Sequence, residues 1–402
     1  MAVNELIGSG FLQRLALQAA AAETQVEVDC LAAERAMYQA RRGHVDEVSA
    51  TLAKLRRLYD SRPNVSVSTW VNLCEGMTSQ FNDMSPRLAD KIRRAHALSK
   101  SAGLTSLCAL SSAWLAHAEY LGANFESMAL HVDQALRLAE KDNHGALSRA
   151  SLAVAQAFHF AGRLDLAQGW YASVQRHAVA DGDDAAMSAL LHTMASMRAS
   201  TLRQNILLQG AAGCDDQHAL VSADSALRFD AMVGLTRHVS SISILRAQIL
   251  SAVGEAEIAL RLYDEHLASA KTEGLGTMQE ADLLADQAWC QVTVGDLAAA
   301  AETSASALAC LGKQGAFVDR ALTHKRLAQV FDALGDIESS TVQQDLASAA
   351  WASHREVQMR IVELLANTSR HQKPIERACA QCQIRSDQIK TSPCLTCGGR
   401  RP

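Results

Sequence analysis

The chain has 402 residues, of which 49% are apolar and only 4% aromatic, with 5 prolines and a formal net charge of -5. This charge excludes a molecule that binds polyanions over its whole surface. The sparse β-branched residues disfavour a large sheet, while the many Ala, Leu, Ser and Gln residues favour closely packed helices. Length alone allows two or three compact domains or one solenoid, whose core grows with every added repeat, and the composition favours the solenoid.

No membrane span and no secretory signal are expected. The longest uncharged run, residues 101–118, is interrupted by Gly103 and several hydroxyl side chains. No basic residue precedes Arg14, which is the wrong charge order for a secretory signal. We therefore expect a cytoplasmic protein.

The first predicted elements are an N-terminal cap and a first helix within residues 3–40. A break at residues 61–64 is predicted to end the first helical pair. Ser85 followed by Pro86 is typical of an N-cap with proline at the first helical position.

A repeat of about forty residues runs through the rest of the chain. Residues 154–158, 246–250 and 327–331 align without gaps, and each segment lies shortly before a glycine. The glycines, spaced 40, 92, 41 and 40 residues apart, are Gly122, Gly162, Gly254, Gly295 and Gly335, and the small residues five positions later are Ser127, Ala167, Ala259, Ala300 and Ser340. The pattern predicts two helices that cross at a small residue after a tight glycine turn.

One stretch does not fit the period. Residues 200–218 form an insertion within the 92-residue spacing, and residues 210–215 are its clearest loop. A surface insertion and a hinge between two halves are both compatible with this loop. After Asp336, a last helix is predicted to run with few breaks to about residue 369, as a terminal capping helix would.

The repeat resembles the tetratricopeptide family, in the forty-residue variety found in bacterial signal-responsive regulators of the MalT type, over roughly residues 31–372. The matching positions are small Ala155, Ala247, Ala288 and Ala328, and bulky Phe158, Leu250 and Phe331 three residues later. The resemblance implies an all-α, right-handed superhelical solenoid of about eight antiparallel helix pairs over residues 1–372. The proline that often closes a repeat is nearly absent, and another α-solenoid, such as one of HEAT repeats, has a similar repeat length.

The sequence contains no recognisable catalytic motif. There is no glycine-rich phosphate loop, nucleophile elbow or His-Glu-x-x-His helix. Glu280 and Asp282 stand two apart on a predicted helix, so their side chains should point in different directions. His117, His159, His192 and His238 and the six scattered cysteines, Cys30, Cys74, Cys108, Cys214, Cys290 and Cys310, are interpreted as structural. We therefore expect a protein that is not an enzyme.

The concave face is the predicted working surface. In tetratricopeptide arrays the first helices of successive pairs line the groove, so the resemblance places Gln156, Gln248 and Gln329 there. A glutamine amide can donate and accept hydrogen bonds to a peptide backbone, although a good helix former on a solvated face explains it equally. Four further residues complete the predicted partner-binding set, namely Arg149, His159, Trp289 and Lys325.

The tail, residues 373–402, carries the strongest local motif. Two C-x-x-C pairs, Cys379 with Cys382 and Cys394 with Cys397, are separated by eleven residues. Four thiolates in this spacing resemble the ligands of small zinc ribbons, and so few apolar residues would need the metal to fold. A redox-active dithiol, iron or a disulfide is the alternative to zinc.

The charge changes at the same boundary. Residues 370–402 contain seven basic and two acidic residues, a net charge of +5, which leaves -10 on the rest of the chain. The leading interpretation is a scaffold that binds a peptide or protein partner in its groove. The alternative is a sensing regulator whose basic zinc tail contacts nucleic acid through phosphates, although the tail lacks the aromatic residues that stack on bases.

Overall fold

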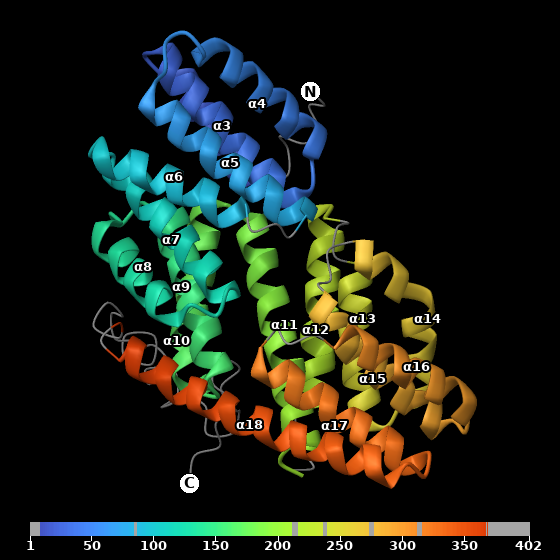
Figure 1. The fold of residues 1–402 in the computed structure, drawn as a ribbon. Helices are drawn as coiled ribbons and strands as arrows, with labels where there is room; N and C mark the ends of the chain where they lie inside the picture. Colours follow the sequence, from blue (N-terminus) through green and yellow to red (C-terminus); the bar gives the residue numbers. More distant parts are fainter. Residues whose placement is uncertain are drawn as a thin grey trace, which may run out of the picture.

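The computed structural model describes residues 9–83, 87–210, 216–235, 239–272, 277–311, 316–366 and 368. Over these residues the chain forms helices α2 to α18 and no strand (Figure 1). The helices of the first half are α2 (Gly10–Ala21), α3 (Gln25–Arg42), α4 (Val45–Tyr59), α5 (Val65–Asp83), α6 (Arg87–Ser101), α7 (Thr105–Leu121), α8 (Phe125–Leu138), α9 (His144–Phe160) and α10 (Leu164–Asp181). Those of the second half are α11 (Asp184–Leu207), α12 (Asp216–Val233), α13 (Val239–Val253), α14 (Ala256–Thr272), α15 (Thr277–Thr293), α16 (Leu297–Cys310), α17 (Phe317–Ala333) and α18 (Ile337–Leu365).

The predicted all-helical repeat is confirmed. Consecutive helices pack as pairs from α3 with α4 to α17 with α18, and in the second half the first helices of neighbouring pairs also pack on each other. Each pair buries apolar side chains between its members, as Phe158 of α9 and Trp170 of α10 do in one continuous core. Burying a side chain of this size contributes about 1.5–3 kcal/mol, so the stability of the array accumulates repeat by repeat.

The glycine turns follow the predicted period with one correction. Gly162, Gly254, Gly295 and Gly335 have φ values of 72°, 92°, 89° and 81°, and each stands two residues before the next helix. At the remaining predicted turn, between α7 and α8, the residue two positions before the next helix is Ala123, with φ 56°, whereas Gly122 has φ -82°. The repeat is therefore one residue out of register there, and the buried crossing position is Met128 rather than the predicted Ser127.

The N-terminal segment contains two helices. The predicted cap and first helix are separated at residues 22–24, where Thr24 accepts from the backbone N–H of Glu27 and the Glu27 carboxylate accepts from the backbone N–H of Thr24. This reciprocal capping box starts α3. The predicted break at residues 61–64 is confirmed, because α4 ends at Tyr59 and α5 begins at Val65. Pro86 lies outside the described residues.

The insertion is partly helical. Residues 200–207 extend α11, which at 24 residues is longer than its neighbours, and the described part of the loop ends at Gly210. The extension matters because Arg203, described below, lies on it.

The last helix does more than cap the array. α18 has 29 residues and runs from α17 along one side of the molecule to α8 and α9 (Figure 1). Ile361 and Leu365 are buried in the same core as Phe158, and Gln358 donates to the backbone carbonyl of Phe160 at 3.0 Å. The end of the array is thereby fastened to its middle.

No described helix has the length and apolar character needed to cross a bilayer. Cys74, Cys108 and Cys290 are buried, Cys30 and Cys310 are half-buried, and Cys214 lies outside the described residues.

Candidate functional site

Buried ion pairs join the first helices of the second half. Arg203 of α11 donates two hydrogen bonds to the Asp282 carboxylate of α15, at 2.7 and 2.8 Å, and its guanidinium also lies 2.8 Å from Asp286. Arg326 of α17 bonds the other oxygen of Asp286 at 2.8 Å. These four residues, which we call the arginine–aspartate network, are each at most 5% exposed. Two guanidinium groups balance two carboxylates, so the network is neutral.

Three of the predicted groove residues contact this network. Gln248 of α13 donates to Asp282 at 3.0 Å, Gln329 accepts from Arg326 at 3.0 Å, and the ring of Trp289 lies 5.6 Å from the Arg326 guanidinium. Each of the two glutamines thus has one hydrogen bond inside the protein. Lys325 of α17 is bonded to Gln344 of α18 at 2.7 Å on the exposed side.

An acidic side chain beside the network has an unusual environment. Burial, together with the charge of Asp282, raises the pKa of Asp319 in the first turn of α17 to about 7, and Arg203 opposes the shift. Glu280, two residues before Asp282, pairs instead with the half-exposed Lys271. The two acids thus point in different directions, as their spacing predicts.

The other predicted groove residues lie in the first half. Gln156 of α9 is buried and donates to Thr193 of α11 at 3.3 Å. His159 is buried, its Nδ1 lies 2.9 Å from the Tyr171 hydroxyl, and burial lowers its pKa to about 4. Arg149, just over one turn from the start of α9, lines a cavity.

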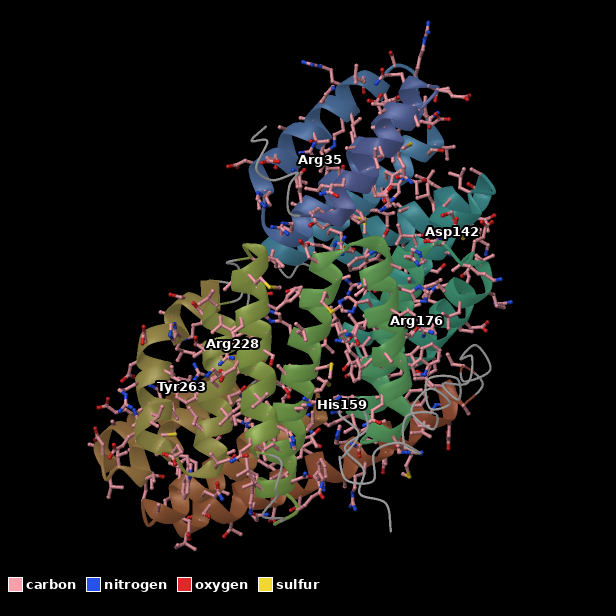
Figure 2. All side chains as sticks on the ribbon, turned by 180° about the vertical axis from the view of Figure 1, so that it is seen from behind. Arg35, Asp142, His159, Arg176, Arg228 and Tyr263 are labelled. Carbon is pink, nitrogen blue, oxygen red and sulfur yellow. The ribbon has the colours of Figure 1, made fainter. Side chains whose placement is uncertain are left out.

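This cavity lies between the N-terminal helices and helices α7, α9, α10 and α11, and has a volume of about 280 Å³. It is found at the end of α9 nearest the N-terminal helices, where Figure 2 labels Asp142, and away from His159. Its apolar walls are Phe11, Met37, Trp70, Leu107, Leu110, Trp114 and Leu152. Its ionisable lining is Arg14, Arg41, Arg149, Glu34, Glu140, Asp142, Asp181, Asp183, His144 and His177.

Contacts between distant parts of the chain form one side of the cavity. The backbone N–H of Phe11 donates to the carbonyl of Gly182 at 3.1 Å, at the end of α10. Gly182 has φ 66°, and a Cβ there would lie 2.7 Å from the backbone of Gly10, so only glycine permits this approach of α2. On α3, Arg42 donates to Asp184 at 2.7 Å and to the carbonyl of Val233 at 2.8 Å. The N-terminal helices are therefore a wall of the cavity rather than a free cap.

The charges in the cavity are unevenly paired. Arg14 bridges Glu34 and Asp181, at 3.0 Å to each, and Arg41 pairs with Asp183 at 2.8 Å. Burial raises the pKa of both Glu34 and Asp181, which share that one guanidinium. Among the described residues, Arg149 has no carboxylate within ion-pair distance and stacks on the Trp114 ring at 3.7 Å.

Two histidines complete the wall of the cavity. The Nδ1 atoms of His144 and His177 lie 3.0 Å apart, so a single proton between them makes one the donor and the other the acceptor. Burial, followed by the proximity of His144 and Arg176, lowers the pKa of His177 to about 4.

Sequence reasoning identified Arg149 but missed the rest of the cavity. Arg14, Glu34 and Asp181 stand far apart in the chain, and no local spacing relates them. In the arginine–aspartate network one local signal exists, because Asp282 and Asp286 are four apart on α15 and so share a helix face.

No group of three or more His, Cys, Asp or Glu side chains within the described ranges is arranged to hold a metal ion. The predicted zinc ligands Cys379, Cys382, Cys394 and Cys397 lie outside those ranges.

Comparisons with known proteins inform the fold alone. No family model matches the chain, and no curated protein matches it. Among solved structures, a Rap protein complexed with competence and sporulation factor aligns with a TM-score of 0.55, covering 90% of this chain and 98% of that one at 12% sequence identity. The chain is thus an all-helical repeat protein with a tetratricopeptide-like fold.

Proposed function

We propose that this protein is a non-enzymatic, cytoplasmic scaffold that binds a peptide or a segment of a partner protein, and that the cavity beside α9 is the deepest part of its binding surface. The supporting observation is the combination of apolar walls with an unpaired buried arginine in one cavity of a helical-repeat protein. Ligand sites are typically apolar clefts with a few fixed polar groups. The similar Rap protein was solved in complex with a factor, which agrees with a binding role for this fold.

The predicted contacts differ in how readily they could reach a partner. Arg149 lines the cavity, so it takes the central place in the proposal. Gln156, Gln248, Gln329, His159, Trp289 and Lys325 stay predictions, and a partner that used the glutamine amides would have to compete with their bonds inside the protein.

Display of random peptides on a particle surface tests the proposal. We expect wild-type protein to select a defined set of peptides, and Ser106→Trp at the exposed rim of the cavity to weaken their binding at least tenfold. The indole would occupy the mouth, and Ser106 is exposed, so folding should be little affected. Fluorescence anisotropy of the selected peptides measures the change.

A matched control separates blockage from a general effect of tryptophan. Ser306 is likewise exposed but lies on α16, far along the chain from the cavity helices, and Ser306→Trp should leave peptide affinity unchanged. Selected peptides that bind all three proteins equally would exclude the cavity as the site.

For the tail we propose a structural zinc site formed by Cys379, Cys382, Cys394 and Cys397, supported by the spacing of the paired motifs. Protein purified under reducing conditions without chelator should contain one zinc per chain by elemental analysis. Cys397→Ser should release the metal, whereas Cys310→Ser, at a half-buried helical position, should not. Wild-type protein without zinc would contradict the site.

The basic tail supports a second proposed role. The net charge of +5 on residues 370–402 suits contacts to phosphates, as in a sensing regulator similar to the MalT type, and such binding should weaken steeply with added salt. Nucleic-acid binding that is lost on deletion of residues 373–402 would favour the regulator over the simple scaffold.

A further inference from the structure

The environment of Arg149 is incomplete without a ligand. The residue is 8% exposed, yet the guanidinium forms no hydrogen bond or ion pair with any described residue and rests on Trp114. An ionised group withdrawn from water is strongly unfavourable unless it is paired, and cation–π stacking offsets only part of that effect. Burial and the nearby Arg41 lower the pKa of Arg149 to about 9, which agrees with a cation that lacks its counter-ion.

The neighbouring charges cannot supply that counter-ion. Asp183 is the acidic residue whose charge acts on the pKa of Arg149. Its carboxylate, however, pairs with Arg41 and also accepts a hydrogen bond from the backbone N–H of Ala186 at 2.9 Å. Arg41, Arg149 and Asp183 together leave one positive charge at this wall. The guanidinium of Arg149 is thus left without a hydrogen-bond partner at one defined place.

We propose that the cavity binds a ligand carboxylate on Arg149, with the apolar group attached to that carboxylate seated against Trp114 and Leu110. Resting on the proposed function, this makes the ligand a peptide whose free C-terminus, ending in an apolar residue, enters the cavity. Arginine suits a carboxylate because its planar fork can donate two parallel hydrogen bonds.

The acidic residues in the rest of the lining disfavour a ligand with more than one negative charge. Glu34 and Asp181 share Arg14, and Glu140 and Asp142 add two more acids to the lining. A dianion such as a phosphate ester would meet this excess of acid with only one unpaired cation to bind it. A monoanionic carboxylate brings the one negative charge that the unpaired Arg149 can take up.

The test compares small probes that share one apolar body. We expect wild-type protein to bind 4-phenylbutyrate about 10–100-fold more tightly than 4-phenylbutyramide, the range for a hydrogen bond to a charged group. 2-Phenylethyl phosphate, a dianion at pH 8, should bind no more tightly than the acid. Titrations followed by ligand-observed NMR give all three affinities.

Arg149→Met provides the matched variant, because methionine keeps an unbranched side chain over Trp114 without the charge. We expect the preference for acid over amide to disappear while the affinity for the amide is kept. The thermal midpoint should stay equal or rise, since an unpaired buried cation has been removed. Peptides from the display experiment should lose affinity when their C-terminus is amidated, and internal peptide segments should not compete with 4-phenylbutyrate.

Equal affinities of acid and amide for the wild-type protein would overturn the proposal, as would an acid preference that survives in Arg149→Met. These outcomes are distinct from failure of the proposed function. Peptides selected without regard to their C-terminus would refute the carboxylate site and leave the scaffold standing, whereas an acid preference without any selected peptide would refute the scaffold alone.

Discussion

Arg203→Ala is expected to lower the free energy of unfolding by about 3–5 kcal/mol, the usual effect of removing one partner from a buried ion pair. The substitution would leave Asp282 without its bidentate partner and Asp286 with Arg326 alone, in a place where water cannot compensate. Because the network joins α11, α15 and α17, the loss should appear in the unfolding of the whole second half. Urea denaturation followed by circular dichroism measures it.

Arg137→Ala is the matched control. Arg137 pairs with Asp133 four residues earlier on α8, with side chains 63% and 46% exposed. Exposed pairs of this kind contribute at most about 1 kcal/mol. If Arg203→Ala cost no more than Arg137→Ala, the ion pairs would not hold the second half together.

Gly182→Ala is expected to release α2 from the end of α10. The added Cβ would lie within 2.8 Å of three backbone atoms of Gly10 and Phe11, and the left-handed φ of 66° is itself unfavourable for alanine. We expect a loss of about 1–2 kcal/mol from the backbone conformation and about 1–3 kcal/mol from the overlap. Protease cleavage near residues 22–24 should become faster, because undocked α2 no longer protects this linker.

Gly254→Ala and Gly295→Ala separate these two contributions. Both glycines have left-handed φ values, but a Cβ at either one meets nothing within 4 Å. They should show the conformational cost alone, with no change in cleavage at residues 22–24. A Gly182→Ala protein as stable and as resistant to cleavage as these controls would refute the close approach of α2.

The repeat could be predicted because it is local. Helix periodicity, a turn glycine and a small residue at the crossing recur within each forty-residue unit, and a pair of helices folds against its neighbours. The one error, at Gly122, arose because alanine at position 123 adopts the left-handed conformation that glycine has at the other turns. Because Gly122 stands next to Ala123, the sequence pattern does not reveal this shift of one residue.

The long-range contacts between distant helices could not be predicted in this way. The docking of α2 on Gly182 and of Gln358 on Phe160 joins residues more than 150 positions apart, and such contacts leave no periodic pattern. The segment that does not fit the repeat has a structural role that the sequence did not reveal. Residues 200–207 broke the period and were interpreted as part of an insertion, yet they extend α11 and carry Arg203 into the network.

In the candidate site, too, the helix that carries each residue could be predicted, but the partners of its side chain could not. Arg149 could be placed on a first helix from the repeat alone, but its lack of a partner depends on how Asp183 and Arg41 meet across the cavity. The glutamines were correctly placed on first helices. Gln156 and Gln248 bond Thr193 and Asp282 of other repeats, so only the packed structure shows these contacts, whereas Gln329 bonds Arg326 on its own helix.

The most direct test of a binding site at the cavity is hydrogen–deuterium exchange of the full-length protein with and without a peptide obtained by display. We expect the peptide to slow exchange in α2, in the first turns of α9 and in the segment that joins α10 to α11, and to leave α13 to α17 unchanged. Slower exchange confined to α13–α17, with the cavity helices unaffected, would contradict the account and place the partner elsewhere on the array.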